Sequence, residues 1–161
     1  MAAHAILNLL SAKFEGGIRR SAIPADDRLY VTIEPRIVRE ACLYIFADLD
    51  ARYVVSVGLD DRKQGEGFLV AHNFAFDREH VLMSLLVPLD ANDPKIDSIT
   101  DLVPAANWAE REFRDLVGIT PVGHAFPKRL VLPDGWPDGV HPLRHDFAWN
   151  ETPPEYDEAR E

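Results

Sequence analysis

Hydrophobic residues recur at helical spacing in three separate stretches of the chain. In the first stretch Ile6, Leu9, Leu10 and Phe14 share one face, because side chains three or four residues apart lie on the same side of a helix. Pro35 suits the first turn of the second helix, and Gly118 closes the third. The spacing therefore predicts helices over residues 4–14, 35–50 and 105–117.

Short runs of β-branched and aliphatic residues predict strands between the helices. These runs lie at residues 29–33, 53–59, 68–76, 80–89 and 129–132. Short polar links join the middle three, so we expect an antiparallel meander there. The predicted fold class is α+β, with an antiparallel or mixed β-sheet of about four strands covered by helices on one face. A helix and a long irregular C-terminal segment follow.

The character of the chain changes along its length. Residues beyond 118 are rich in Pro, Gly and charged side chains, and a long irregular segment in a small domain is unusual unless it is functional or lies on a partner. We therefore expect an α+β domain at 1–100, a helix and a partner-wrapping segment at 101–147, and an acidic flexible tail at 148–161.

Composition narrows the possible functions. The chain has 161 residues, a net charge of −10 and one cysteine. This acidity argues against nucleic acid as a partner, because phosphate binding needs clustered Lys and Arg. One thiol forms no disulfide within the chain, and it cannot supply the Cys ligands of an iron–sulfur cluster. The apolar stretch at 2–10 lacks a basic leader and no run could span a bilayer, so we expect a cytoplasmic protein without a signal peptide.

The predicted helix at 105–117 carries an unusual mixture of apolar and charged residues. On a helical wheel Glu112 falls inside the apolar arc, between Trp108 and Leu116. A buried carboxylate needs a cation or several hydrogen-bond donors, and Arg129 and Arg144 are the candidates. We therefore predict that Glu112 forms a buried junction with the C-terminal segment. The ion pairs expected on the outer face are Glu110 with Arg114 and Arg111 with Asp115.

The same helix and the segment after it resemble a known family. The residues that carry the resemblance lie between 101 and 147 and include Glu110-Arg111-Glu112, Asp115-Leu116-Val117, His124, Lys128, Leu130-Val131, His141-Pro142-Leu143-Arg144 and Asp146. Their types and spacing are similar to the signature of the thirty-kilodalton subunit of complex I, the C-type subunit of NADH:quinone oxidoreductase. The resemblance extends to the branch of membrane-bound nickel–iron hydrogenases, and residues 121–139 look slightly more like that branch.

The resemblance implies a structural subunit of the peripheral arm with no redox cofactor of its own. Its expected partners are a separate large catalytic subunit, iron–sulfur subunits and, through the complex, a membrane arm. The iron–sulfur clusters and the quinone or nickel–iron site would belong to those partners. The residues expected to form the partner interface or its charge network are Trp108, Glu110, Arg111, Glu112, Asp115, His124, Arg129, Trp136, His141, Arg144 and Asp146, with Trp149 as a further interface residue.

Two other hypotheses remain open at this point. His124, His141, His145 and Asp146 are types of residue that bind metal ions, so the chain could be a small metal-dependent enzyme. It could also be a free-standing scaffold of the same fold. Cys42 is expected to be a small core residue.

Overall fold

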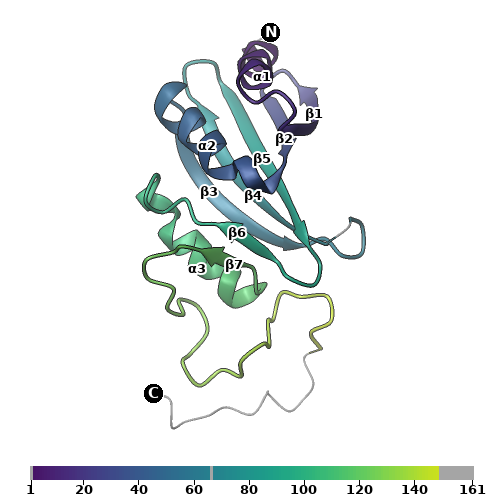
Figure 1. The fold of residues 1–161 in the computed structure, drawn as a ribbon, viewed down its shortest axis with the longest axis vertical. Coiled ribbons are helices and arrows are strands. Elements are labelled where there is room, and N and C mark those ends of the chain that lie inside the picture. Colours follow the sequence, from purple (N-terminus) through teal and green to yellow (C-terminus); the bar gives the residue numbers. More distant parts are fainter. Residues whose placement is uncertain (1, 66, 149–161) are drawn as a thin grey trace.

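The computed structural model describes residues 2–65 and 67–148 (Figure 1). Trp149 and nearly all of the predicted tail therefore lie outside the described residues. In chain order the elements are α1 (Ala2–Lys13), β1 (Ile18–Ala25), β2 (Arg28–Ile33), the 3-10 turn η1 (Pro35–Ile37), α2 (Val38–Leu43), the π-helical turn η2 (Tyr44–Asp48), β3 (Arg52–Asp60), β4 (Gly67–Phe76), β5 (Val81–Asp90), β6 (Lys95–Asp97), the 3-10 turn η3 (Pro104–Ala106), α3 (Asn107–Leu116) and β7 (Thr120–Val122).

A five-stranded mixed sheet forms the centre of the fold, in the order β1-β2-β5-β4-β3. The predicted meander is confirmed, because β4 pairs antiparallel with both β3 and β5. β2 joins the other side of β5 in parallel, and β1 pairs antiparallel with β2. The α+β class is confirmed, with β1 as a strand that the sequence pattern did not predict. Its sequence IRRSAIPA is polar and mostly exposed, so it lacks the alternation of a half-buried strand.

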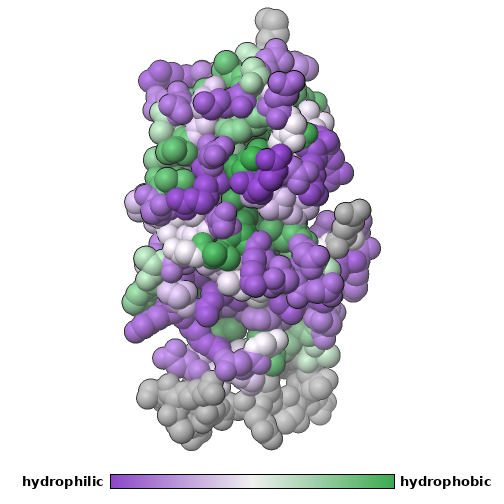
Figure 2. All heavy atoms as spheres, in the orientation of Figure 1, coloured by the Kyte–Doolittle hydropathy of each residue, from purple (hydrophilic) through white to green (hydrophobic). Residues whose placement is uncertain are grey.

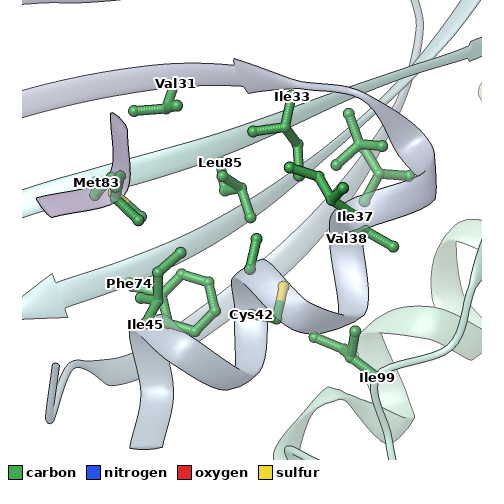
Figure 3. Packing of buried hydrophobic residues seen from close by; sticks show 14 of the residues in the cluster. Val31, Ile33, Ile37, Val38, Cys42, Ile45, Phe74, Met83, Leu85 and Ile99 are labelled. Atoms are coloured by element: carbon green, nitrogen blue, oxygen red, sulfur yellow. The ribbon is translucent and has the colours of Figure 1, made fainter. Parts of the chain in front are cut away.

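The helices cover one face of this sheet and form the core with it (Figure 1). Val38, Cys42 and Ile45 from α2 and η2 point toward Phe74 and Leu85 of the sheet (Figure 3). β5 alternates between buried and partly buried positions along its length, as expected of a strand with one face in the core. Cys42 is fully buried in this core, as predicted. The helix-covered side carries a largely hydrophilic surface with scattered hydrophobic residues (Figure 2).

One prediction of a short strand was wrong, and two short strands were not predicted. Residues 129–132 form no strand, because their amide groups bond to a side chain instead of to a neighbouring strand. The short strands β6 and β7 pair in parallel as a separate two-stranded sheet, next to α3. Each has three residues, which is too short for a hydrophobic period to be visible in the sequence.

Candidate partner-binding site

Helix α3 presents three distinct faces. The first faces the core with Ala106, Phe113 and Val117 of the helix and its flanks. The second binds the irregular segment at residues 124–148, which we call the strap. The third faces away from the other described residues, and Trp108 on it is 70% exposed. Side chains from the second face fix the strap.

Asp115 is the centre of the contact between α3 and the strap. One of its carboxylate oxygens accepts hydrogen bonds from the backbone N–H groups of Leu130, Val131 and Leu132, at 2.7, 2.9 and 3.3 Å. The side chain is buried. Three N–H donors satisfy a buried carboxylate and fold the strap tightly around it. The predicted pairing of Asp115 with Arg111 is therefore replaced by backbone contacts.

Two arginines of α3 hold the neighbouring carbonyl groups of the strap. The Arg111 guanidinium donates to the carbonyl oxygens of Lys128 and Arg129, at 2.8 and 2.7 Å. Arg114, predicted to pair with Glu110, donates instead to the carbonyl of Pro127. Cationic donors to carbonyl oxygens are among the stronger hydrogen bonds in proteins. The polar face of α3 thus binds the strap through its main chain.

The strap also caps the C-terminus of α3. His141 donates from Nδ1 to the carbonyl of Asp115 at 2.8 Å, and the Leu143 amide donates to the carbonyl of Leu116 at 2.9 Å. Arg144 donates from Nε to the carbonyl of Val117 at 2.7 Å. The last carbonyls of a helix have no partner within it and carry partial negative charge, so a cation is favourable there. Burial lowers the pKa of His141, which favours the neutral ring.

A glycine makes this cap possible. Gly118 has φ +80°, a conformation that side chains with a Cβ rarely adopt. A Cβ at this position would overlap a guanidinium nitrogen of Arg144 and Nε2 of His141. Gly118 therefore allows both the turn and the close approach of the strap.

The far end of the strap is fixed to the end of β3. Asp60 forms an ion pair with Arg62 at 2.6 Å and accepts the backbone N–H of His145 at 2.8 Å. The bond from the Arg62 side chain, followed by the backbone N–H groups of His145 and Arg62, holds the pKa of Asp60 well below its usual value. Arg62 also pairs with Asp146 at 3.1 Å. Arg62 and Arg144 both lie over the ring of Phe68, at 4.9 and 5.0 Å from its centroid.

The predicted buried junction of Glu112 was wrong, because Glu112 is exposed. The buried carboxylate of α3 is Glu110, which is only 1% exposed. Its Oε1 accepts the Ile99 amide at 2.8 Å, while Oε2 has no hydrogen-bond partner among the described residues. Burial raises the pKa of Glu110 above its usual value, and the nearby Ser98 hydroxyl and the Ile99 amide offset this in part. Glu110 therefore ties α3 to the loop before it, away from the strap.

Arg129 and Trp136 make their contacts within the strap. Arg129, proposed as a partner of Glu112, forms an ion pair with Asp138 at 2.9 Å. The Trp136 indole donates to the carbonyl of Val140 at 2.9 Å, and the side chain is half-buried. Arg144, the second proposed partner, contacts the end of α3 instead. Arg129 and Trp136 therefore stabilise the shape of the strap.

The residues of the metal-site hypothesis are held by different partners. His124 accepts the Phe126 amide at Nδ1 and lies 3.4 Å from the carbonyl of Asn107 through Nε2, so its ring bridges α3 and the start of the strap. His141 and Asp146 make the contacts described above, and His145 is exposed. Across residues 2–65 and 67–148, no group of three or more His, Cys, Asp or Glu side chains is arranged to hold a metal ion.

A buried polar chain in the sheet was not predicted. The hydroxyl oxygens of Tyr53 and Ser56 on β3 are 2.8 Å apart, and the Ser56 hydroxyl lies 2.6 Å from Nδ1 of His72 on β4. Nε2 of His72 has no hydrogen-bond partner within the described part of the chain. Burial lowers the pKa of His72 to about 4, so the ring is neutral at physiological pH. His72 interrupts an apolar run in the sequence, and nothing in the pattern says which face it occupies.

The fold and the site together define a class: a small α+β domain whose last helix holds a long irregular strap through backbone contacts. Within that class, the chain belongs to the family described as respiratory-chain NADH dehydrogenase, 30 Kd subunit, whose model matches residues 31–153. The family predicted from residues 101–147 is therefore confirmed.

Relatives of this chain include subunits of several redox enzymes. The chain is 36% identical over 141 residues to formate hydrogenlyase subunit 5 of Escherichia coli (strain K12), covering 87% of this chain and 25% of that protein. It is 34% identical over 148 residues to the C subunit of F(420)H(2) dehydrogenase from Methanosarcina mazei, covering 91% and 92%. Among solved structures it is similar to a trypsin-resistant fragment of Nqo5, with a TM-score of 0.62, 25% identity and coverage of 78% and 99%. The chain thus spans about a quarter of one relative and nearly all of another.

Proposed function

We propose that this chain is a structural subunit of a complex I-type NADH:quinone oxidoreductase or of a related energy-converting nickel–iron hydrogenase. In this proposal it docks on the large catalytic subunit through α3 and the strap. The observation that carries the proposal is the way α3 holds the strap. Asp115, Arg111 and Arg114 bind its backbone between residues 127 and 132, so the exposed side chain of Val131 is not needed for this contact and can meet another protein.

Exposed apolar side chains support a protein partner at this site. Trp108 on α3 is 70% exposed, and Leu143 on the strap is 60% exposed. Phe126 and Val131 of the strap are exposed as well. Tryptophan is enriched among residues that dominate binding energy, and rigid apolar groups lose little entropy on binding. A partner that covers these side chains would remove them from water.

The lengths of the relatives support the proposed partner. In formate hydrogenlyase subunit 5 the matched region is 25% of the polypeptide, so a much larger part of the same protein accompanies it. A region joined to its neighbour in one chain is present at a high effective concentration, which suits a permanent contact. We therefore propose that the large catalytic partner corresponds to the remainder of that relative.

In the proposed complex this chain supplies no redox centre. Its single cysteine, Cys42, is buried in the core and burial raises the pKa of its thiol, so it is poorly suited to metal ligation. We propose that the clusters and the quinone or nickel–iron site lie in partner subunits. None of the helices in the described part of the chain is long and apolar enough to cross a bilayer. The proposed location is the cytoplasmic side of the membrane, reached through the complex.

The test is affinity purification of the tagged chain from mildly solubilised membranes of its host, with mass spectrometry and metal analysis. Recovery of a large catalytic subunit together with iron–sulfur and membrane subunits is expected. The Asp115→Ala variant should recover less of the large subunit, whereas Asp134→Ala, an exposed carboxylate of the strap, should recover the wild-type amount. Recovery of the chain alone from membranes that contain those subunits would contradict the assembly role. Stoichiometric iron or zinc in the isolated chain would contradict the cofactor-free role.

A further inference from the structure

β3 is one of the two outer strands of the central sheet. It pairs with β4 on one side, and within the described residues no strand lies along its other side. An outer strand carries backbone N–H and C=O groups that another extended segment can bind. Such a strand needs protection in a protein that works alone.

The two outer strands differ in how well they are protected. β1 contains Arg19, Arg20 and Pro24, and its pairing with β2 is interrupted twice. Charged residues, proline and irregular pairing all prevent further strands from adding. β3 has the sequence RYVVSVGLD, whose only charged residues, Arg52 and Asp60, stand at its two ends. Its interior carries none of these protective features except one bulge near its start.

The side chains of β3 also favour contact with another protein. Val54, Val55, Val57 and Leu59 are exposed, the last two by 41% and 43%. On the face of the sheet away from the helices, Leu59 lies beside Leu69 in the strand register. Soluble proteins usually protect the outer strands of their sheets, so an exposed, uncharged, aliphatic edge in a chain that is 27% charged points to an interaction site.

We propose that β3 is a docking edge for the large partner. An extended, uncharged segment of that partner pairs with residues 55–59 as an added strand, and its aliphatic side chains cover Val57 and Leu59. Backbone hydrogen bonds supply the affinity in this mode of recognition, and alternate side chains supply the specificity. The inference rests on the proposed function, because the segment belongs to the partner that the strap holds.

The position of the strap supports this occupant. The strap ends beside β3, where the His145 amide donates to Asp60 at 2.8 Å and Asp146 pairs with Arg62. A protein bound to the strap is therefore placed next to the C-terminal end of β3. The two surfaces would form one continuous interface around the edge of the sheet.

A second copy of this chain fits the edge less well. If two copies of β3 paired antiparallel about a two-fold axis at Ser56, the bulge between Tyr53 and Val55 of each copy would lie opposite the regular part of the other. Bulged residues break the hydrogen-bonded ladder, so little of such a pairing would survive. Each copy also has a net charge of −10, which opposes self-association. A partner with its own register avoids both problems.

The experiment places a charge on the edge and measures what the complex retains. Val57→Lys, Val57→Thr, Leu9→Lys and Asp115→Ala are each expressed as tagged full chains, and the large subunit that co-purifies from host membranes is quantified. Lys at position 57 should reduce recovery about tenfold or more, because it prevents strand addition. Thr keeps the branched, uncharged shape and should leave recovery unchanged. Leu9 on α1 is 49% exposed and lies away from β3, so its Lys variant is the matched control.

A cross-link identifies the occupant directly and does not depend on the Lys variant folding. Cys42 is fully buried, so a cysteine placed at Val57 is the reactive thiol to which a photo-activated probe can be attached. A cross-link from position 57 to the large subunit is the expected result. A cross-link to a second copy or to another subunit would overturn the proposal. Full recovery of the large subunit with Val57→Lys, but not with Asp115→Ala, would overturn the edge and leave the proposed function intact. If wild type recovers no large subunit, the proposed function fails and the docking edge fails with it.

Discussion

Replacing Asp115 by Ala should release the middle of the strap from α3. The carboxylate accepts three backbone N–H groups at 2.7, 2.9 and 3.3 Å, and the longest of these is weak. Hydrogen bonds to a charged group contribute about 1.5–3 kcal/mol each, but the freed amides are partly exposed and can bind water. We therefore expect the strap to lose about 2–4 kcal/mol of local stability in this variant.

Hydrogen exchange of single amides measures this loss where it occurs. At about 1.4 kcal/mol per tenfold, the change corresponds to a roughly 30- to 700-fold faster exchange of the amides at 130–132. The Leu143 amide bonds to the Leu116 carbonyl at the opposite end of the contact. If the strap opens as one unit, Leu143 will accelerate together with residues 130–132. If Asp115 acts locally, Leu143 will keep its protection.

Two controls limit the interpretation. Asp134→Ala removes an exposed carboxylate of the same strap and should leave exchange at 130–132 unchanged. Amides of β4 and β5 report on the central sheet and should not change in either variant. Wild-type protection at 130–132 in Asp115→Ala would refute the reasoning, because it would mean that the strap does not depend on this carboxylate.

Three further variants test the buried groups and the helix cap. His72 has a pKa of about 4 when folded against 6.5 in its unperturbed state, so the unfolded chain binds more protons between these values. The free energy of unfolding should be highest above pH 6.5 and fall by about 3 kcal/mol as the pH drops toward 4. In urea titrations at pH 7 and 5, His72→Phe should show a smaller loss than wild type. Burial raises the pKa of Glu110, so ionising this carboxyl group lowers the free energy of unfolding as the pH rises above 4.5. Glu110→Gln should therefore become more stable relative to wild type between pH 5 and 8. A stability difference between the two that stays constant over this range would contradict the reasoning. Gly118→Ala should cost about 1–3 kcal/mol more than Gly123→Ala, because both have positive φ but only Gly118 faces the Arg144 side chain; equal urea midpoints would exclude the steric explanation.

Regular hydrophobic periods made most of the fold predictable. The helix at 105–117 and the meander at 53–89 carry long repeats, and each was found at the expected place. β1 was missed because its sequence is polar and shows no alternation. It is an outer strand, and it is extended because it pairs with β2. Tertiary pairing of this kind leaves little signal in the residues themselves.

The error at Glu112 shows a limit of the helical wheel. The apolar residues of α3 spread over a broad arc, and the wheel does not say which part of the arc faces the sheet. The buried stripe is centred on Phe113 and Val117, so it includes Glu110 and leaves Trp108 and Glu112 outside. Arg111 and Asp115 of the signature contact the strap, but their partners there are backbone atoms. Every residue carries the same backbone amide and carbonyl groups, so the sequence pattern does not indicate which of them a side chain will contact.

The choice of backbone partners has a consequence for function. Arg111, Arg114 and Asp115 fix the strap by its amide and carbonyl groups, which every residue provides. The middle of the strap is therefore held by α3 through groups that do not depend on its side chains, whereas Arg129, Trp136 and Arg144 use their side chains to fix other parts of it. Val131 and Leu143 are exposed to solvent and can be matched to a partner without loss of these contacts. A segment held in this way is pre-organised for binding, because the entropy of ordering it is lost on folding instead of on association.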